Sequence, residues 1–262
     1  MSVNSYLTNL ASDLVLSESE KGSITTSITT LSARLNSYFE FTITKHFQFG
    51  SSTRGTILPR KADSNSDIDY MVVFNTSSET VKKPQTYLDR LKRFAEANYS
   101  TSEVYQSSPT VVLSLNHIKF ELVPAVYSYG YQIPSIASSW TEWILTDPSG
   151  TNQALQDKNN ANNYQIKPIV RLVKYWNAGK GHHFASFSLE EYIVNKSFWS
   201  CAALRDYFYD FWSGFSCTQD TPQYIKDKVE SAKQHAKKAK EYEDNNMPAS
   251  AESEIKRIVP AL

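Results

Sequence analysis

The sequence predicts an α+β fold whose second half is entirely helical. Apolar alternation with a period of two, which is typical of strands, is confined to residues 41–123. Beyond about Trp140, nearly every segment carries apolar residues at helical spacing. No linker rich in Pro, Gly or Ser separates the halves, so we expect domains over 1–140 and 141–262 that pack with a ligand-binding cleft between them.

Helices and strands alternate in the first half. Residues 4–40 predict a short helix followed by a long one, because apolar residues such as Ile28, Leu31 and Leu35 recur at helical spacing. The later elements are expected as a strand over 41–49, a buried strand over 67–74, a helix over 84–99, and short strands over 103–107, 110–115 and 118–123. A tight turn at 116–117 joins the last two strands.

The second half reads as a set of helices. They are expected over 152–162, 164–178, 187–203, 204–212, 223–242 and 249–259. This half therefore predicts a helical domain of its own.

Composition excludes several classes of protein. The 262 residues contain 27 basic and 27 acidic side chains, so the neutral chain gives no electrostatic reason to bind extended nucleic acid. Its two cysteines, Cys201 and Cys217, lack the spacing of a disulfide framework or a zinc site. No apolar run is as long as a membrane span, and the N-terminus does not resemble a signal peptide, which predicts a cytoplasmic protein without membrane partners.

The segment from Phe47 to Phe74 carries the most informative residues. A strand ends at Gly50-Ser51, where glycine allows close backbone approach and the amides that follow are suited to a phosphate. The next strand begins with Asp67 and Asp69, which lie two residues apart and therefore project from the same face. Two such carboxylates repel each other unless a cation lies between them, and magnesium accepts oxygen ligands of this kind.

A third acid is expected on a neighbouring strand. Glu121 lies in an otherwise apolar strand, where an unpaired carboxylate is costly. One reading is a surface salt bridge with Lys119. The other reading places Glu121 with Asp67 and Asp69, which together predict a two-metal phosphoryl-transfer site holding two Mg²⁺ or Mn²⁺ ions.

These motifs resemble a known family. The polymerase-beta-like nucleotidyltransferase superfamily carries motifs similar to Gly50-Ser51, Arg54-Gly55-Thr56, Asp67-x-Asp69 and the strand containing Glu121. The resemblance implies the fold of that superfamily, in which a mixed sheet with helices packs against a C-terminal helical domain. The Arg-Gly-Thr triplet resembles the branch containing oligoadenylate synthetase, cyclic GMP-AMP synthase and the bacterial CD-NTases of anti-phage signalling. The segments IVRLVKYWN and HHFASFSLEEYIV, within 169–194, resemble two helices of the same family.

The resemblance implies roles for individual residues. Asp67, Asp69 and Glu121 would bind the metal ions, with Glu121 also helping to take a proton. The residues implied in nucleotide binding are Gly50, Ser51, Arg54, Lys174, Ser186 and Phe187. Among them, Phe187 would stack on a base and Lys174 would neutralise phosphates. Core packing for Phe187, a helix cap for Ser186 and a loop-holding role for Arg54 are the alternatives.

The function implied is synthesis of a cyclic or linear oligonucleotide second messenger from nucleoside triphosphates, ATP among them, with release of pyrophosphate. A downstream effector protein that responds to the product is implied as well. One alternative is nucleotide transfer to a separate acceptor, such as a tRNA, a protein or an antibiotic. Another is a nucleotide-binding pseudoenzyme, since the family usually carries Asp where this sequence has Glu121.

Overall fold

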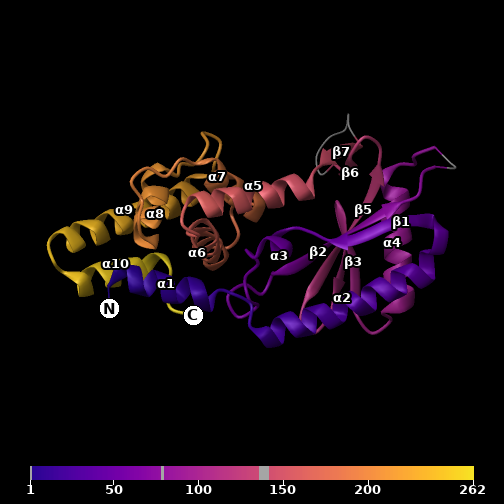
Figure 1. The fold of residues 1–262 in the computed structure, drawn as a ribbon, viewed down its shortest axis with the longest axis horizontal. Coiled ribbons are helices and arrows are strands. Elements are labelled where there is room, and N and C mark those ends of the chain that lie inside the picture. The colour runs from indigo at the N-terminus through magenta and orange to yellow at the C-terminus, as the bar shows by residue number, and fades with distance from the viewer. Residues whose placement is uncertain (1, 78–79, 136–141) are drawn as a thin grey trace. The chain divides into compact units, whose positions relative to one another are not determined.

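The computed structural model describes residues 2–77, 80–135 and 142–262 and confirms the predicted α+β class (Figure 1). The chain divides into two compact units. The sheet unit comprises Ser17–Ile57 and Asn65–Gln153, and the helical unit comprises Met1–Leu16, Leu58–Ser64 and Ala154–Leu262. The domain boundary predicted between residues 140 and 141 lies outside the described residues.

The sheet unit is built around one mixed sheet. The described strands are β1 (Ile43–Gln48), β2 (Asp67–Phe74), β3 (Glu103–Ser107), β4 (Thr110–Ser114), β5 (Lys119–Tyr127), β6 (Tyr131–Pro134) and β7 (Trp143–Thr146). Their order is β1-β2-β5-β4-β3, with β6 pairing β5 and β7 pairing β6. The central pair, β2 and β5, runs parallel, and the other described pairs are antiparallel.

Two helices cover part of this sheet. In Figure 1 the helices α2 (Glu18–Phe39) and α4 (Pro84–Asn98) lie alongside the strands. The ring of Phe39 in α2 contacts Phe74 of β2 and Phe94 of α4. The α2 helix begins with a capping box, because Ser17 Oγ accepts from Glu20 N and Glu20 Oε2 accepts from Ser17 N. The short elements η1 (Glu40–Thr42) and α3 (Ser51–Arg54) flank β1.

The helical unit combines the N-terminal helix with the second half of the chain. Its helices are α1 (Val3–Asp13), α5 (Pro148–Ala161, which begins in the sheet unit), α6 (Ile166–Gly179), α7 (Ser186–Asn195), α8 (Leu204–Gly214), α9 (Gln223–Asp244) and α10 (Pro248–Ile258). Tyr6 Oη donates to the carbonyl of Val259 over 2.7 Å, and Figure 1 shows α1 and α10 side by side. Arg171 Nε donates to the carbonyl of Ala11, which ties α1 to α6.

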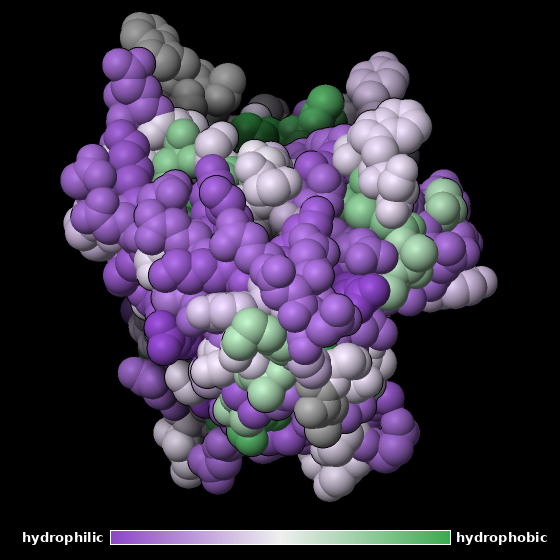
Figure 2. All heavy atoms as spheres, turned by 90° about the vertical axis from the view of Figure 1, so that its left-hand side faces the viewer, coloured by the Kyte–Doolittle hydropathy of each residue, from purple (hydrophilic) through white to green (hydrophobic). Residues whose placement is uncertain are grey.

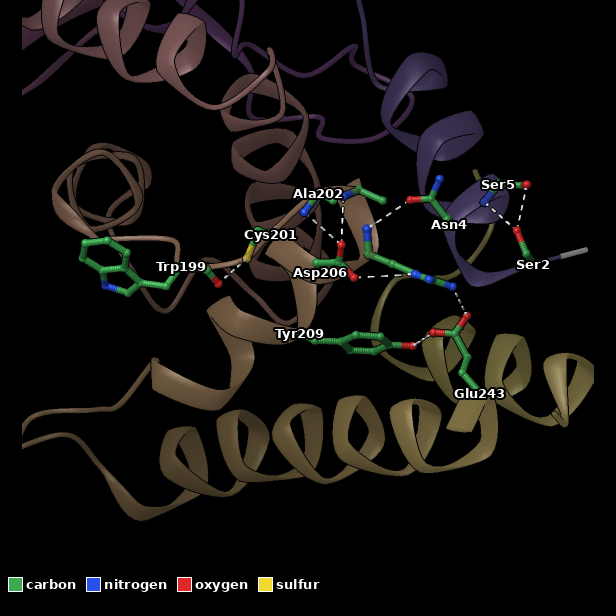
Figure 3. Close-up of polar contacts among 11 residues, drawn as sticks. Ser2, Asn4, Ser5, Trp199, Cys201, Ala202, Asp206, Tyr209 and Glu243 are labelled. Atoms are coloured by element: carbon green, nitrogen blue, oxygen red, sulfur yellow. Dashed lines mark hydrogen bonds and ion pairs between the residues drawn. The ribbon is translucent and has the colours of Figure 1, made fainter. Parts of the chain in front are cut away.

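Charged side chains fasten the start of α8 to its neighbours (Figure 3). Asp206 accepts from the backbone amides of Ala202 and Ala203, which satisfies donors at the helix N-terminus. The ring of Tyr209 points towards Glu243 of α9, and its hydroxyl donates to Glu243 Oε2 over 2.8 Å. Arg205 donates to the other oxygen of Glu243 over 3.0 Å, so one carboxylate joins α8 to α9.

The structure corrects two expectations about elements. The strands β6 and β7 are not among the strands predicted from the sequence, and β7 lies beyond residue 140, where only helices are expected. Each of these strands has four residues, which is too short for a clear alternation of apolar and polar side chains. The helix predicted over 187–203 ends at Asn195, because the chain becomes extended at Lys196 and Trp199 is 82% exposed.

The outer surface at one end of the helical unit is largely hydrophilic. Figure 2 looks onto this end and shows hydrophobic residues in small, separate patches. Within the described ranges, no helix has the length and apolar character needed to cross a membrane.

Candidate active site

The two aspartates lie at the start of β2, as predicted. Asp67 and Asp69 are half-buried, whereas Ile68 and Tyr70 between and after them are buried. Because successive strand residues face opposite sides of a sheet, the two carboxylates share one face. The alternation along β2 thus agrees with the shared face expected from the sequence, and a role in metal binding stays a prediction.

Glu121 lies beside this pair on β5. In the parallel register of β2 and β5, Asp69 is opposite Glu121 and Asp67 is opposite Lys119. Residues opposite each other on neighbouring strands present their side chains to the same face. The structure thus brings the three acids together on adjacent strands, in the centre of the sheet.

The electrostatics of Glu121 reflect its crowded position. The pKa of Glu121 is raised to about 7, first by burial and then by the negative charge of Asp67 and a hydrogen bond with its side chain. Lys119 opposes the increase through its charge, and a hydrogen bond with Thr110 also lowers the pKa. Thr110, which is 5% exposed at the start of β4, is not among the residues predicted for the site. The only sign of Thr110 in the sequence is a polar residue directly before two valines in an apolar strand.

Gly50 forms the turn that faces these acids. Its φ of 74° and ψ of −156° belong to a backbone region that essentially only glycine adopts. A β-carbon at this position would meet Asp69 Oδ2 at 1.8 Å, so the Asp69 carboxylate lies directly against the Gly50 backbone. The amide of Phe49 also donates to the Asp69 carbonyl over 3.0 Å.

The Arg-Gly-Thr triplet closes the turn after α3. Gly55 has a left-handed conformation with φ of 72° and ends the helix. The carbonyl of Ser51 accepts from the amides of Thr56 and Ile57 at 3.0 and 3.2 Å. Arg54 is only 7% exposed and Thr56 is fully buried, which is the burial expected for residues that hold the loop. A role for Arg54 in nucleotide binding stays a prediction.

Three predicted nucleotide-binding residues belong to the helical unit. Lys174 lies in α6 and is 7% exposed, an unusual burial for a lysine. Ser186 is the first residue of α7, and the N-cap position is Ala185, so Ser186 is not the cap. Phe187 is 49% exposed, which rules out full core packing. Their roles in binding a nucleotide stay predictions.

Asn177, which is not among the predicted site residues, holds the backbone before α7 in place. Its side-chain nitrogen donates to the carbonyl of Phe184 over 2.8 Å, and its Oδ1 accepts from the amide of Phe184 over 3.1 Å. These bonds fix the segment that leads into α7. Trp176, by contrast, is 2% exposed in the core, as the sequence analysis favoured.

The described residues contain no preformed metal-binding cluster. Within residues 2–77, 80–135 and 142–262, no group of three or more His, Cys, Asp or Glu side chains is arranged to hold a metal ion. The oxygen-only character of Asp67, Asp69 and Glu121 nevertheless matches the chemistry that hard divalent cations prefer.

The first part of the chain matches a known protein family. Residues 1–159 match the Second Messenger Oligonucleotide or Dinucleotide Synthetase domain, abbreviated SMODS, over more than half of the chain. The chain belongs to the SMODS family. The CD-NTase resemblance predicted from the sequence is thereby confirmed.

Individual relatives agree with this SMODS assignment. A probable cyclic nucleotide synthase of Bacillus cereus (strain VD146) is 28% identical over 112 residues, which are 39% of this chain and 34% of that protein. The oligonucleotide cyclase CdnC of Escherichia coli (strain KTE188), described as a CBASS cyclase, is 26% identical over 62% of this chain and 54% of its own length. The matches therefore span about half or less of these curated relatives.

A solved structure shows the same fold over nearly the whole chain. Vibrio cholerae DncV, a cyclic AMP-GMP synthase in complex with nonhydrolyzable GTP, superposes with a TM-score of 0.76 at 12% identity. The superposition covers 99% of this chain and 96% of DncV. The predicted polymerase-beta-like fold class is thus confirmed for this SMODS protein.

Proposed function

We propose that this SMODS protein is a nucleotidyltransferase that joins ribonucleoside triphosphates into a cyclic or linear oligonucleotide with release of pyrophosphate. The observation that carries the proposal is the parallel register that places Asp69 opposite Glu121, with Asp67 on the same face and Gly50 against Asp69. A row of carboxylates beside a glycine turn is the arrangement expected for phosphoryl transfer.

The three acids suit divalent cations by their chemistry. Asp67, Asp69 and Glu121 offer only hard oxygen donors, and burial together with the charge of Asp67 raises the pKa of Glu121, which a bound cation would counter. We propose that they hold two Mg²⁺ or Mn²⁺ ions after side-chain adjustment, since the described residues contain no preformed metal cluster. Such ions supply Lewis-acid stabilisation to the attacking hydroxyl and to the leaving pyrophosphate.

The residues of the chain have distinct tasks in the reaction. A ribose hydroxyl oxygen forms a bond to the α-phosphorus while the bridging oxygen to the β-phosphorus breaks away with pyrophosphate. The proton of the hydroxyl passes to a carboxylate, for which Glu121 is our candidate. Gly50 and the amides after it would bind phosphate oxygens, because a residue without a side chain allows close approach to the backbone.

The remaining parts of the proposal follow the family. The named activities of the B. cereus, E. coli and V. cholerae proteins support nucleoside triphosphates, ATP or GTP among them, as substrates. The implied roles of Arg54, Lys174, Ser186 and Phe187 in nucleotide binding belong to the same proposal. So do a cytoplasmic location, a part in anti-phage signalling, and an effector protein that responds to the product.

The test is incubation of the purified protein with four labelled ribonucleoside triphosphates and Mg²⁺ or Mn²⁺, followed by phosphatase treatment and product separation. We expect a phosphatase-resistant product and matching pyrophosphate release. The Asp67→Asn, Asp69→Asn variant should yield neither while remaining folded, because these carboxylates are held for charge rather than for packing. Glu103→Gln is the matched control, since Glu103 is an exposed carboxylate on β3 of the same sheet.

Other outcomes point to the alternatives. Product that forms only after a tRNA, protein or small hydroxyl compound is added identifies an acceptor-dependent transferase. Nucleotide binding without pyrophosphate release under any acceptor condition identifies a pseudoenzyme. Unfolding of the aspartate variant counts against the proposed site, since it assigns these residues to structure.

A further inference from the structure

Two chains of side-chain hydrogen bonds hold the turn between β1 and α3. The first begins at Gln48, the last residue of β1, and we call it the Gln48 relay. Gln48 Nε2 donates to Ser52 Oγ over 2.8 Å, and Ser52 Oγ donates to the carbonyl of Phe49 over 3.1 Å. Because a hydroxyl has a single proton, the bond from Gln48 leaves the proton of Ser52 directed at the Phe49 carbonyl.

The second chain, the Asn152 relay, reaches the same turn from a distant part of the sequence. Asn152 Nδ2 donates to Thr53 Oγ1 over 3.3 Å, and these two residues are 99 positions apart. Thr53 Oγ1 donates in turn to the carbonyl of Gly50 over 2.9 Å. Two consecutive carbonyls of the turn are therefore each held by a hydroxyl, and each hydroxyl by a side-chain amide.

The start of α5 sets the position of Asn152. Asp147 Oδ1 accepts from the amide of Gly150 over 2.9 Å, and the helix begins with Pro148, which is a typical helix start. Asn152 follows one turn later and belongs, like α3, to the sheet unit. Its Oδ1 is buried without a hydrogen-bond partner among the described residues, which is a cost to stability. Stability alone therefore does not explain an asparagine at this position.

The relays fix the direction of two backbone amides. In a planar trans peptide, the carbonyl and the N–H point in opposite directions. The Phe49 carbonyl shares its peptide with the Gly50 amide, and the Gly50 carbonyl shares its peptide with the Ser51 amide. Holding the two carbonyls therefore directs both amides away from the relay hydroxyls. Neither amide donates to an acceptor in the part of the chain that the structure describes.

We propose that the Gln48 relay and the Asn152 relay orient the amides of Gly50 and Ser51 for the phosphate chain of a nucleoside triphosphate, an inference that rests on the proposed function. Donors that are oriented before the ligand arrives need no reorganisation when the charged group binds. The relay side chains contact the turn rather than the phosphates, so they are positioning residues.

The test separates the hydroxyl of Thr53 from its bulk. Thr53→Val removes the hydroxyl and keeps the branched shape, whereas Thr53→Ser keeps the hydroxyl. In calorimetric titrations at constant Mg²⁺, Thr53→Val should raise the Kd of a nonhydrolysable ATP analogue about tenfold, as expected when a hydrogen bond to a charged group is misaligned. Inorganic tripolyphosphate, which has no base, should be weakened by the same factor. Thr53→Ser should restore both Kd values.

Two further variants complete the design. Asn152→Leu should raise the Kd of both probes by a similar factor, and its combination with Thr53→Val should be no weaker than either single variant, because both interrupt one relay. Thr29→Val is the matched control. Thr29 is exposed on α2, and its hydroxyl likewise donates to a helix carbonyl over 2.9 Å. This control should bind both probes as the unaltered protein does.

The outcomes distinguish the relays from the reaction. The proposal is overturned by an unchanged Kd in Thr53→Val, by an equal loss in Thr53→Ser, or by a loss for the ATP analogue without one for tripolyphosphate. A urea midpoint that falls further in Thr53→Val than in Thr29→Val also overturns it, because the relay then serves folding. These results leave nucleotidyl transfer standing. If the unaltered protein binds both probes but releases no pyrophosphate from ATP, the transfer fails and the Kd comparison still decides the relays. An unaltered protein that binds neither probe overturns both proposals.

Discussion

The backbone of Gly50 and the carboxylate of Asp69 occupy adjoining space, with only 1.8 Å between Asp69 Oδ2 and the place where a β-carbon on residue 50 would lie. The hydrogen bond from the Phe49 amide to the Asp69 carbonyl joins the end of β1 to β2 at the same point. The turn expected to receive phosphate and the acid expected to bind metal therefore form one structural unit. A change in either should alter the other.

We expect Gly50→Ala to damage both folding and activity. The backbone conformation of Gly50 costs about 1–3 kcal/mol for other residues, and the added methyl group displaces Asp69 as well. Displacement of a reacting group by about 1 Å can reduce the rate about 100-fold. Urea denaturation and pyrophosphate release measure the two effects.

Gly22→Ala is the matched control for that substitution. Gly22 lies within α2 and has no atom within 4 Å of an added β-carbon, so alanine should stabilise the helix by about 1 kcal/mol. Activity should be unchanged. If Gly50→Ala were as active as Gly22→Ala, the close contact with Asp69 would have no functional meaning.

Phe187→Ala should weaken nucleotide binding without unfolding the protein. Loss of stacking between an aromatic ring and a base costs about 1–3 kcal/mol, or roughly a 5- to 150-fold increase in Kd. Because Phe187 is 49% exposed, little core packing is lost. Trp199→Ala, at an 82% exposed aromatic residue of the same unit, is the control and should leave the Kd unchanged in equilibrium binding of ATP. Equal Kd values for both variants would exclude base stacking by Phe187.

The placement of the acids could be predicted because it depends on local geometry. The spacing of Asp67 and Asp69 fixes a shared face once β2 is a strand, and an acid in an apolar strand singled out Glu121. The helices of the second half were predicted for a similar reason, since a repeating apolar face persists over several turns. These signals are all contained in short windows of sequence.

The remaining features depend on contacts between distant segments. The approach of Asp69 to Gly50 requires the register of β1 and β2, and the hydrogen bond of Thr110 to Glu121 requires the pairing of β4 with β5. The strands β6 and β7 were missed because four residues carry too little periodicity. The burial of Trp176 Nε1 without a hydrogen-bond partner among the described residues likewise depends on tertiary packing.

The stability of the sheet unit should fall in acid because of His46. Burial lowers the pKa of His46 from its usual value, and the ring lies between Tyr70 Oη at 2.8 Å and Asn36 Oδ1 at 2.9 Å. A histidine pKa that is lower in the folded state contributes stability above the unfolded value of about 6.5, and that stability is lost as the pH falls through the folded pKa. Urea midpoints measured downward from pH 7.5 should therefore decrease in the unaltered protein and decrease less in His46→Gln. Parallel pH profiles for both proteins would assign the acid sensitivity to other groups.

Glu243→Ala should destabilise the helical unit more than its position near a helix end suggests. Its carboxylate accepts from Tyr209 Oη at 2.8 Å and from Arg205 at 3.0 Å, and its side chain is 15% exposed, so the substitution leaves two donors without their acceptor. We expect a loss of about 1–3 kcal/mol in the free energy of unfolding. Glu241→Ala, at a 58% exposed carboxylate of the same helix, should change that free energy by no more than about 0.5 kcal/mol. Denaturant titrations of the two variants compare a buried bridge with a surface ion pair, and equal losses would show that Glu243 does not join α8 to α9.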